Sequence, residues 1–248
     1  MPSFISEFKD FLLTSENPKN AEAQKRYLYS NLKHYGLTTK QNFDFIKKYN
    51  LEFQALSKQH ALGMAQKLWD KRSYEERGAG LYIVSVHSDT LDIKDMPWIE
   101  RWMRECGGWA LLDGFIIPFM PKILTKDKSV YSYLKKWIKD DDYWVRRSAL
   151  LAQLLLFRDN QGGDKRLFFD MAKSQFDESW IDKVYITSED KKRARFFIRK
   201  AIGWTLREMG RKDPEGAFTF LKENKDKMSG LSFRDGSRRL PKSYKDRL

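Results

Sequence analysis

The chain has 248 residues, of which 41% are hydrophobic and 15% aromatic, a composition typical of a folded protein. Its 47 Lys and Arg against 34 Asp and Glu give a formal charge of +13, which favours a polyanionic partner, nucleic acid before an anionic membrane surface. The longest nearly charge-free stretch, 106–121, is too short to span a membrane, and the first residues show no signal peptide. The single Cys106 excludes an internal disulfide, and the sequence has no Cys/His cluster or glycine-rich phosphate loop. We therefore expect a cytoplasmic protein without a metal site or cofactor.

The elements predicted first along the chain are helices. Residues 4–13 place apolar side chains at three- and four-residue spacing, and residues 41–49 repeat this pattern. Ser73 followed by Glu76 predicts a capping box at a helix start. The β-branched run 81–86 is interpreted as the end of that buried helix, because the helical pattern before it is unbroken.

Glycine and proline positions predict further helix boundaries. Gly36, Gly210 and Gly230 stand where helices could stop. Asp213-Pro214 combines a capping residue with a proline suited to a first turn, and therefore predicts a helix start.

A weak internal repeat is also present. The pattern Arg-x-Ala recurs at Arg77, Arg147 and Arg199, and the first two are 70 residues apart with Asp113 near the midpoint. Units of about 35–45 residues are typical of HEAT-like helix pairs, although a plain helical bundle is the alternative. The last interval is longer, and its excess falls near residues 174–190, which we interpret as a loop insertion.

Positive charge is concentrated near the C-terminus. Residues 188–248 contain 18 Lys and Arg against 9 Asp and Glu, which accounts for +9 of the total. The dense block 191–200 lies beside aromatic residues, which favours a phosphate-contacting face over a merely solvated one.

The stretch 107–120 carries a single ionisable residue, Asp113. Because burying an unpartnered carboxylate is costly, Asp113 must pair with an arginine, cap a helix or line a cleft. Trp109 lies four residues earlier on the same helical face, where an indole and a carboxylate could together hold a cation. That pairing suits removal of an N3- or N7-alkylated purine, since the departing base is cationic and leaves an oxocarbenium ion on the sugar. An ion pair within a helical stack is the alternative interpretation.

Five sequence blocks in order carry a family resemblance. They are Glu16-Asn17-Pro18 with Ala21, Arg26-Tyr27 and Gly36; Leu68-Trp69-Asp70 with Glu76 and Ala79; Trp109-x-x-x-Asp113; Trp144–Ala149; and Lys200–Glu208. Over roughly residues 1–240 the chain resembles the AlkD-type DNA alkylation repair glycosylases, the HEAT-like repeat alkylpurine DNA glycosylases.

The resemblance implies an all-α fold, a superhelical stack of HEAT-like antiparallel helix pairs with a concave basic DNA-binding face. It implies one domain over residues 1–240, followed by a basic tail at 241–248. The implied protein is a monomer that binds double-stranded DNA containing alkylated purines and acts as a DNA glycosylase in base excision repair, without a cofactor.

The same resemblance assigns roles to individual residues. Asp113 would be the catalytic carboxylate. The expected DNA contacts are Trp109, Trp204, Arg147, Arg207, Thr39 and Lys40. Two positions depart from the family: Ala110 stands where an acidic residue is common, and an arginine is missing near the end of the loop after Gly36, so that Lys40 would supply a single phosphate contact.

Two other functions stay open from the sequence. The same scaffold could bind damaged or branched DNA without catalysis, or it could bind another protein. Asp113 together with both tryptophans favours the enzyme, because a binder needs no carboxylate facing phosphates. The basic C-terminal region favours either DNA function over protein binding.

Overall fold

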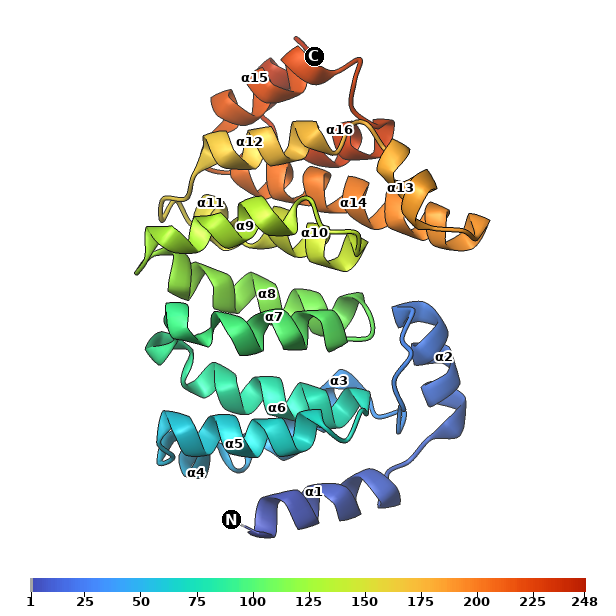
Figure 1. The fold of residues 1–248 in the computed structure, drawn as a ribbon, viewed down its shortest axis with the longest axis vertical. Helices are drawn as coiled ribbons and strands as arrows, with labels where there is room; N and C mark the ends of the chain where they lie inside the picture. The colour runs from blue at the N-terminus through green and yellow to red at the C-terminus, as the bar shows by residue number, and fades with distance from the viewer. Residues whose placement is uncertain (1) are drawn as a thin grey trace. The chain divides into compact units, whose positions relative to one another are not determined.

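The computed structural model describes residues 2–248, with side chains from residue 4 onward. Apart from one isolated bridge between Lys33 and Ser73, the described backbone forms helices and no strands, so the predicted all-α class is confirmed (Figure 1). The chain divides into two compact units, unit 1 ending at Phe115 and unit 2 covering Ile116–Leu248. The concave basic face and the single domain over residues 1–240 stay predictions.

Unit 1 is a stack of short helices in which α5 and α6 form the most extensive pair (Figure 1). Its helices are α1 (Pro2–Thr14), α2 (Pro18–Leu28), α3 (Thr39–Lys47), α4 (Asn50–Gln54), α5 (Lys58–Trp69), α6 (Tyr74–Val86), α7 (Met96–Glu105) and the beginning of α8 (Trp109–Leu124), with 3-10 turns at Ser88–Thr90 and Ile93–Asp95.

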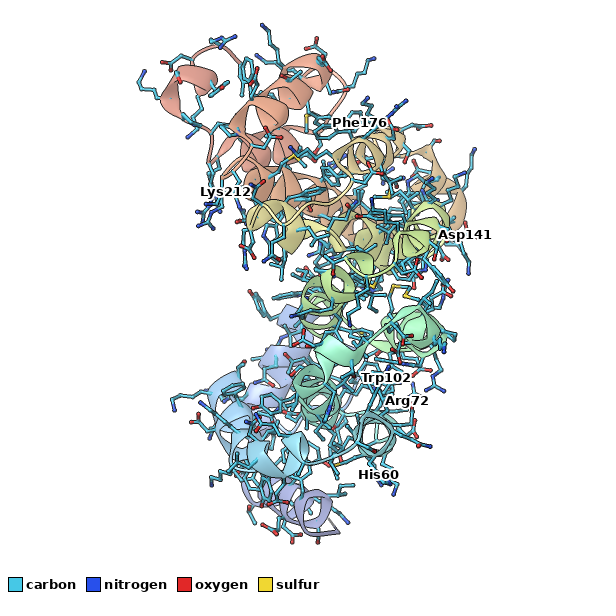
Figure 2. The ribbon with its side chains drawn as sticks, turned by 90° about the vertical axis from the view of Figure 1, so that its left-hand side faces the viewer. His60, Arg72, Trp102, Asp141, Phe176 and Lys212 are labelled. Atoms are coloured by element: carbon cyan, nitrogen blue, oxygen red, sulfur yellow. The ribbon has the colours of Figure 1, made fainter. Side chains whose placement is uncertain are left out.

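The core of unit 1 is aromatic. The rings of Trp69 on α5 and Trp102 on α7 stack with centroids 4.3 Å apart and an interplanar angle of 3°; Trp102 is labelled in Figure 2. Trp98 and Phe115 pack around this pair, and their own rings lie 5.9 Å apart. Because Phe115 belongs to α8, this cluster fixes the beginning of α8 against the rest of unit 1.

Unit 2 is organised around its longest helix, α14 (Ser188–Met209), which packs against α10, α11 and α16. Its other helices are α9 (Tyr131–Trp137), α10 (Tyr143–Leu151), α11 (Leu154–Arg158), α12 (Lys165–Ser174), α13 (Ser179–Val184), α15 (Pro214–Asn224), α16 (Gly230–Ser237) and α17 (Lys242–Lys245), with a 3-10 turn at Lys128–Val130. The basic tail 241–248 contains α17, whose Tyr244 ring contacts Phe218 of α15 at 5.1 Å.

Most of the local predictions are confirmed. The apolar stripe of residues 4–13 lies in α1, and residues 81–86 are helical, as the end of α6. Asp213 caps α15 by accepting the Gly216 N–H, with Pro214 as the first helical residue.

Other boundary predictions need correction. Ser73 does cap α6, but the Glu76 carboxylate accepts the Ser73 hydroxyl instead of completing a backbone capping box. Gly36 does not end a helix, because α2 already ends at Leu28. Gly230 begins α16 instead of terminating a helix, since Ser229 supplies the N-cap.

The segment 174–190 is more than the loop insertion that the sequence suggested. It contains α13, because the run from Ser179 to Val184 can bury Ile181. The Trp180 ring lies 3.6 Å beneath the Arg146 guanidinium of α10. The Tyr185 hydroxyl accepts the backbone N–H of Tyr143 and donates to the carbonyl of Asp141, labelled in Figure 2. The segment therefore braces the beginning of α10.

Burial of His34 predicts a pH-dependent stability. The ring stacks on Tyr74 at 4.7 Å, and its Nε2 is buried without a hydrogen-bond partner among the described residues. This burial, followed by the charge of Lys25, lowers the pKa of His34 from 6.5 to about 4. As the pH falls, the unfolded chain is protonated at this histidine before the folded chain is. The contribution of neutral His34 to the free energy of unfolding is therefore complete above pH 6.5 and is lost as the pH falls toward 4. The expected loss of unfolding free energy is on the order of 2–3 kcal/mol.

The measurement is urea denaturation at pH 7.5 and pH 4.5. His34→Gln, which cannot titrate, is expected to show a smaller difference between the two pH values than the wild type. The matched control is His60→Gln at an exposed histidine, which is expected to behave like the wild type. Equal pH dependence in all three proteins would exclude His34 as the source.

Candidate catalytic carboxylate and nucleic-acid interface

Trp109 and Asp113 lie one turn apart at the beginning of α8. Asp113 is 8% exposed, and Trp109 is half-buried. Phe115, two residues after Asp113, points to the other side of the helix and into the tryptophan cluster of unit 1. The aromatic core thus holds the helix that presents Trp109 and Asp113 together, as the sequence spacing predicted.

The end of α2 fixes the indole of Trp109. The Trp109 Nε1 donates to the Tyr27 carbonyl at 3.3 Å, and the Tyr27 ring stands edge-on to the indole with centroids 5.7 Å apart. Tyr27 itself is 71% exposed. Sequence reasoning gave Tyr27 no role, although it belonged to the first block of the family resemblance.

The glycine pair before Trp109 makes this contact possible. Gly107 has φ +70°, and its carbonyl accepts the Asn31 N–H at 3.1 Å. A Cβ on Gly108 would lie 2.7 Å from the carbonyl oxygen of Leu28. Only glycine therefore lets the loop after α2 approach the beginning of α8 this closely.

Thr39 and Lys40 lie at the beginning of α3, and both are exposed. The loop before them is fixed by the buried carboxylate of Glu75, which accepts the backbone N–H groups of residues 35–37 at 2.9–3.3 Å. Desolvation raises the pKa of Glu75 despite these three donors. The Lys40 Nζ pairs with Asp44 at 2.5 Å on the exposed surface, a contact that water and salt weaken.

Trp204 and Arg207 lie on α14 in unit 2. Trp204 is half-buried, between Thr205, whose hydroxyl donates to the Leu150 carbonyl at 3.0 Å, and Gly203, which packs closely against α16. The Arg207 guanidinium donates to Asp235 of α16 at 2.5 Å, and its side chain is 13% exposed. Arg207 is therefore held within unit 2 by an ion pair.

Arg147 on α10 is 3% exposed. Its guanidinium donates to the Phe197 carbonyl of α14 at 2.8 Å and lies 5.4 Å from the centre of the Phe197 ring. Arg77, the related residue of the sequence repeat, similarly lies over the Trp69 ring and donates to the Trp69 carbonyl at 3.0 Å. Two of the three repeat arginines thus join one helix to the backbone of a neighbour, whereas Arg199 pairs with the Glu178 carboxylate.

The basic block 191–200 is largely ion-paired within unit 2. Glu178, just before α13, accepts from both Arg195 and Arg199. Asp182 of α13 pairs with Arg195 at 2.7 Å and with Lys191 at 3.6 Å. These acids were not connected with the block in the sequence, because they lie nine to 21 residues before their partners. Much of the positive charge that favoured a phosphate-contacting face is therefore balanced locally.

Other chemistry-bearing groups in the described residues offer no second centre. Cys106 is fully buried, and burial raises the pKa of its thiol, so it is not a thiolate nucleophile at neutral pH. Within residues 4–248, no three His, Cys, Asp or Glu side chains gather closely enough to hold a metal ion. None of the described helices combines the length and apolar character needed to cross a membrane.

Gly114, directly after Asp113, provides a test of which surface faces DNA. It is exposed, and a Cβ there would meet no atom within 4 Å; the same is true of Gly63 on α5. Replacing either helical glycine by alanine is expected to stabilise the protein by about 0.5–1 kcal/mol. If the beginning of α8 contacts DNA, Gly114→Ala lowers DNA affinity while Gly63→Ala does not, as fluorescence anisotropy with a labelled duplex would measure. Equal affinities would show that this surface stays clear of DNA.

The described chain is thus a helical protein with one candidate reactive group, the Asp113 carboxylate, which lies one turn from Trp109 on α8. The chain belongs to the family of DNA alkylation repair enzymes, whose sequence pattern matches residues 9–240. The solved structure of a predicted DNA alkylation repair enzyme from Enterococcus faecalis is similar, with a TM-score of 0.70 and 20% sequence identity over 92% of this chain and 98% of that one. No curated protein matches the sequence. The family membership supports a DNA-binding enzyme with a role in alkylation repair.

Proposed function

We propose that the protein is a monofunctional DNA glycosylase that hydrolyses the N-glycosidic bond of cationic N3- and N7-alkylated purines. The observation that carries this proposal is the pair of Trp109 and Asp113, one turn apart on a helix anchored by the core of unit 1. Membership in the alkylation repair family supports DNA as the substrate on which this pair acts.

The chemistry of the lesion fits a single carboxylate. An alkylated purine carries a positive charge and leaves without protonation, so no general acid is needed at the base. The sugar becomes an oxocarbenium ion, which a nearby negative charge stabilises. In this proposal Asp113 supplies that charge and orients the attacking water, and the indole of Trp109 packs against the lesion's sugar.

The residues of unit 2 enter the proposal as DNA contacts. Trp204 would flank the lesion's backbone, and Arg147 and Arg207 would act on nearby phosphates. Thr39 and Lys40 would contact phosphates from unit 1. We further propose that the protein acts as a monomer in the cytoplasm on double-stranded DNA.

In this proposal, replacing Arg147 is expected to lower both the stability of the protein and its affinity for DNA. Arg147→Ala removes the buried guanidinium that donates to the Phe197 carbonyl and contacts the Phe197 ring, at an expected cost of about 1–3 kcal/mol in unfolding free energy. It is also expected to weaken DNA binding more than it slows base release at saturating protein. Urea denaturation, anisotropy and single-turnover assays of the same preparation measure the three quantities. A lowered stability with unchanged DNA affinity would leave Arg147 a purely structural residue.

The direct test is incubation with a duplex that carries one 7-methylguanine, followed by chromatography of the released base. Release of 7-methylguanine is expected, and a matched duplex with uracil is expected to release nothing, because a neutral base is a poorer leaving group than a cationic one and the proposed catalytic group, the Asp113 carboxylate, donates no proton to it. Binding to the alkylated duplex without base release would instead favour a non-catalytic binder of damaged DNA. Neither binding nor release would exclude both functions.

A further inference from the structure

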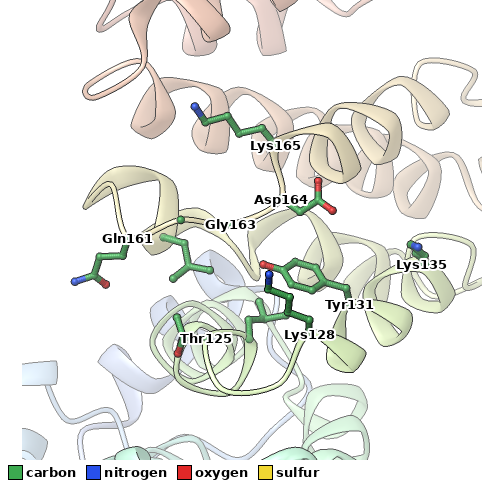
Figure 3. Close-up of a pocket in the computed structure, with 11 residues that line it drawn as sticks. Thr125, Lys128, Tyr131, Lys135, Gln161, Gly163, Asp164 and Lys165 are labelled. Carbon is green, nitrogen blue, oxygen red and sulfur yellow. The ribbon is translucent and has the colours of Figure 1, made fainter.

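Unit 2 contains a pocket of about 1000 Å³, and none of the residues that line it is assigned above to DNA repair (Figure 3). Its walls come from the end of α8, the beginning of α9 and the segment that joins α11 to α12. The lining residues are Leu124, Thr125, Lys128, Tyr131, Lys135, Leu156, Gln161, Gly162, Gly163, Asp164 and Lys165.

One wall of the pocket is held in place by buried groups. The amide of Gln153, 1% exposed, accepts the Asp164 N–H at 2.6 Å and donates to the Asp164 carbonyl at 3.4 Å. Gly162 and Gly163 have φ values of +98° and +92°, which glycine adopts readily. A Cβ on Gly163 would lie 2.7 Å from Phe157. The wall is therefore a preorganised structure, which lowers the entropic cost of binding.

The charge of the pocket is positive and partly unbalanced. Lys165 pairs with Asp213 at 2.6 Å, and its side chain points away from Tyr131 (Figure 3). The Asp164 carboxylate is engaged as the N-cap of α12. Lys128 and Lys135 have no ion-pair partner in the part of the chain that the structure describes. Two free ammonium groups at one pocket are suited to an anion.

The volume of the pocket and its apolar surface favour an organic anion over a small inorganic one. Leu124, Leu156 and the ring of Tyr131 contribute apolar surface, and the volume far exceeds that of a phosphate ion and lies at the upper end of the range for small organic ligands, about 300–1000 Å³. We propose that this pocket binds a nucleotide, with its phosphate on Lys128 and Lys135 and its base against the apolar wall. The nucleotide is either free or part of a DNA strand.

Amide chemical shifts of the full-length protein test this proposal at the pocket itself. Titration with 2′-deoxyadenosine 5′-monophosphate is expected to shift the Gly162 and Gly163 amide resonances in a saturable manner. Deoxyadenosine, which lacks the phosphate, and inorganic phosphate, which lacks the base, are each expected to bind at least tenfold more weakly. Equal affinity for inorganic phosphate, or no saturable shift with the nucleotide, would overturn the assignment.

Matched double variants separate the pocket from general charge effects. Lys128→Gln with Lys135→Gln is expected to weaken nucleotide binding at least tenfold. Lys139→Gln with Lys227→Gln removes the same charge from exposed positions outside the pocket and is expected to change it little. Thr125→Trp keeps both lysines but fills the pocket, and it is also expected to abolish binding. Equal losses in the two double variants would refute a specific site.

Titration with a 5′-phosphorylated DNA tetranucleotide distinguishes a free nucleotide from a nucleotide within a DNA strand as the natural ligand. Binding at least tenfold tighter than the mononucleotide identifies a DNA strand as the ligand, whereas equal or weaker binding identifies a free nucleotide. The inference does not rest on the proposed glycosylase. Asp113→Asn is expected to leave nucleotide binding unchanged, so that failure of base release and failure of this pocket would be seen separately.

Discussion

Asp113→Asn is expected to slow release of 7-methylguanine by about 10²–10³ while the fold and the DNA affinity are retained. Asparagine has nearly the shape of aspartate but no charge, so the substitution separates electrostatic stabilisation of the oxocarbenium ion from packing. DNA affinity should hold or rise, because a carboxylate repels phosphates. Single-turnover base release, anisotropy and thermal melting on one preparation provide the three measurements.

A second buried aspartate of unit 1 is the matched control. Asp95 is 5% exposed and pairs with Lys58 at 2.6 Å, and it also accepts the Trp98 indole N–H at 3.0 Å. Asp95→Asn should therefore lower stability and leave base release per folded molecule unchanged. If Asp113→Asn gives that same result, with a cost of about 3–5 kcal/mol, Asp113 is the partner of a buried cation and the catalytic assignment fails. The non-catalytic DNA binder then becomes the better proposal.

Patterns that depend on neighbouring residues could be predicted from the sequence. The stripe of residues 4–13, the Asp213-Pro214 start of α15 and the one-turn spacing of Trp109 and Asp113 each involve positions within one helix. The periodicity of a helix and the chemistry of its caps determine these features locally. The repeat Arg-x-Ala likewise marked two buried arginines, although not the carbonyl groups that they bind.

Features that depend on distant segments could not be predicted. Nothing near Trp109 in the sequence indicates that the Tyr27 carbonyl, 82 residues earlier, accepts its indole N–H. The ion pairs that Glu178 and Asp182 form with the basic block depend on the fold of the segment around α13, which its polar sequence did not reveal. A count of charge along the chain therefore overstated the free positive charge at residues 191–200, because ion pairs form in space.

The role of Gly36 also depends on a segment that is distant in the sequence, and its replacement is expected to have a large effect on stability. Its sequence context suggested a helix end, yet it lies in the loop between α2 and α3 with φ +83°. A Cβ there would lie 2.1 Å from the Asn17 carbonyl oxygen and 2.8 Å from the Ala21 nitrogen. Both atoms are backbone at the beginning of α2, so neither can move without displacing that helix.

Gly36→Ala is therefore expected to lower the unfolding free energy by about 3 kcal/mol or more, combining the left-handed backbone cost of about 1–2 kcal/mol with the steric conflict. At about 2–4 °C per kcal/mol for a chain of this size, the melting temperature should fall by roughly 6–12 °C. Gly63→Ala, with open space around its Cβ, is the control and should shift stability slightly in the opposite direction. The loop also holds the beginning of α3, so DNA affinity should fall together with stability if Thr39 and Lys40 contact phosphates. A Gly36→Ala protein as stable as the wild type would show that the loop after α2 does not pack as described.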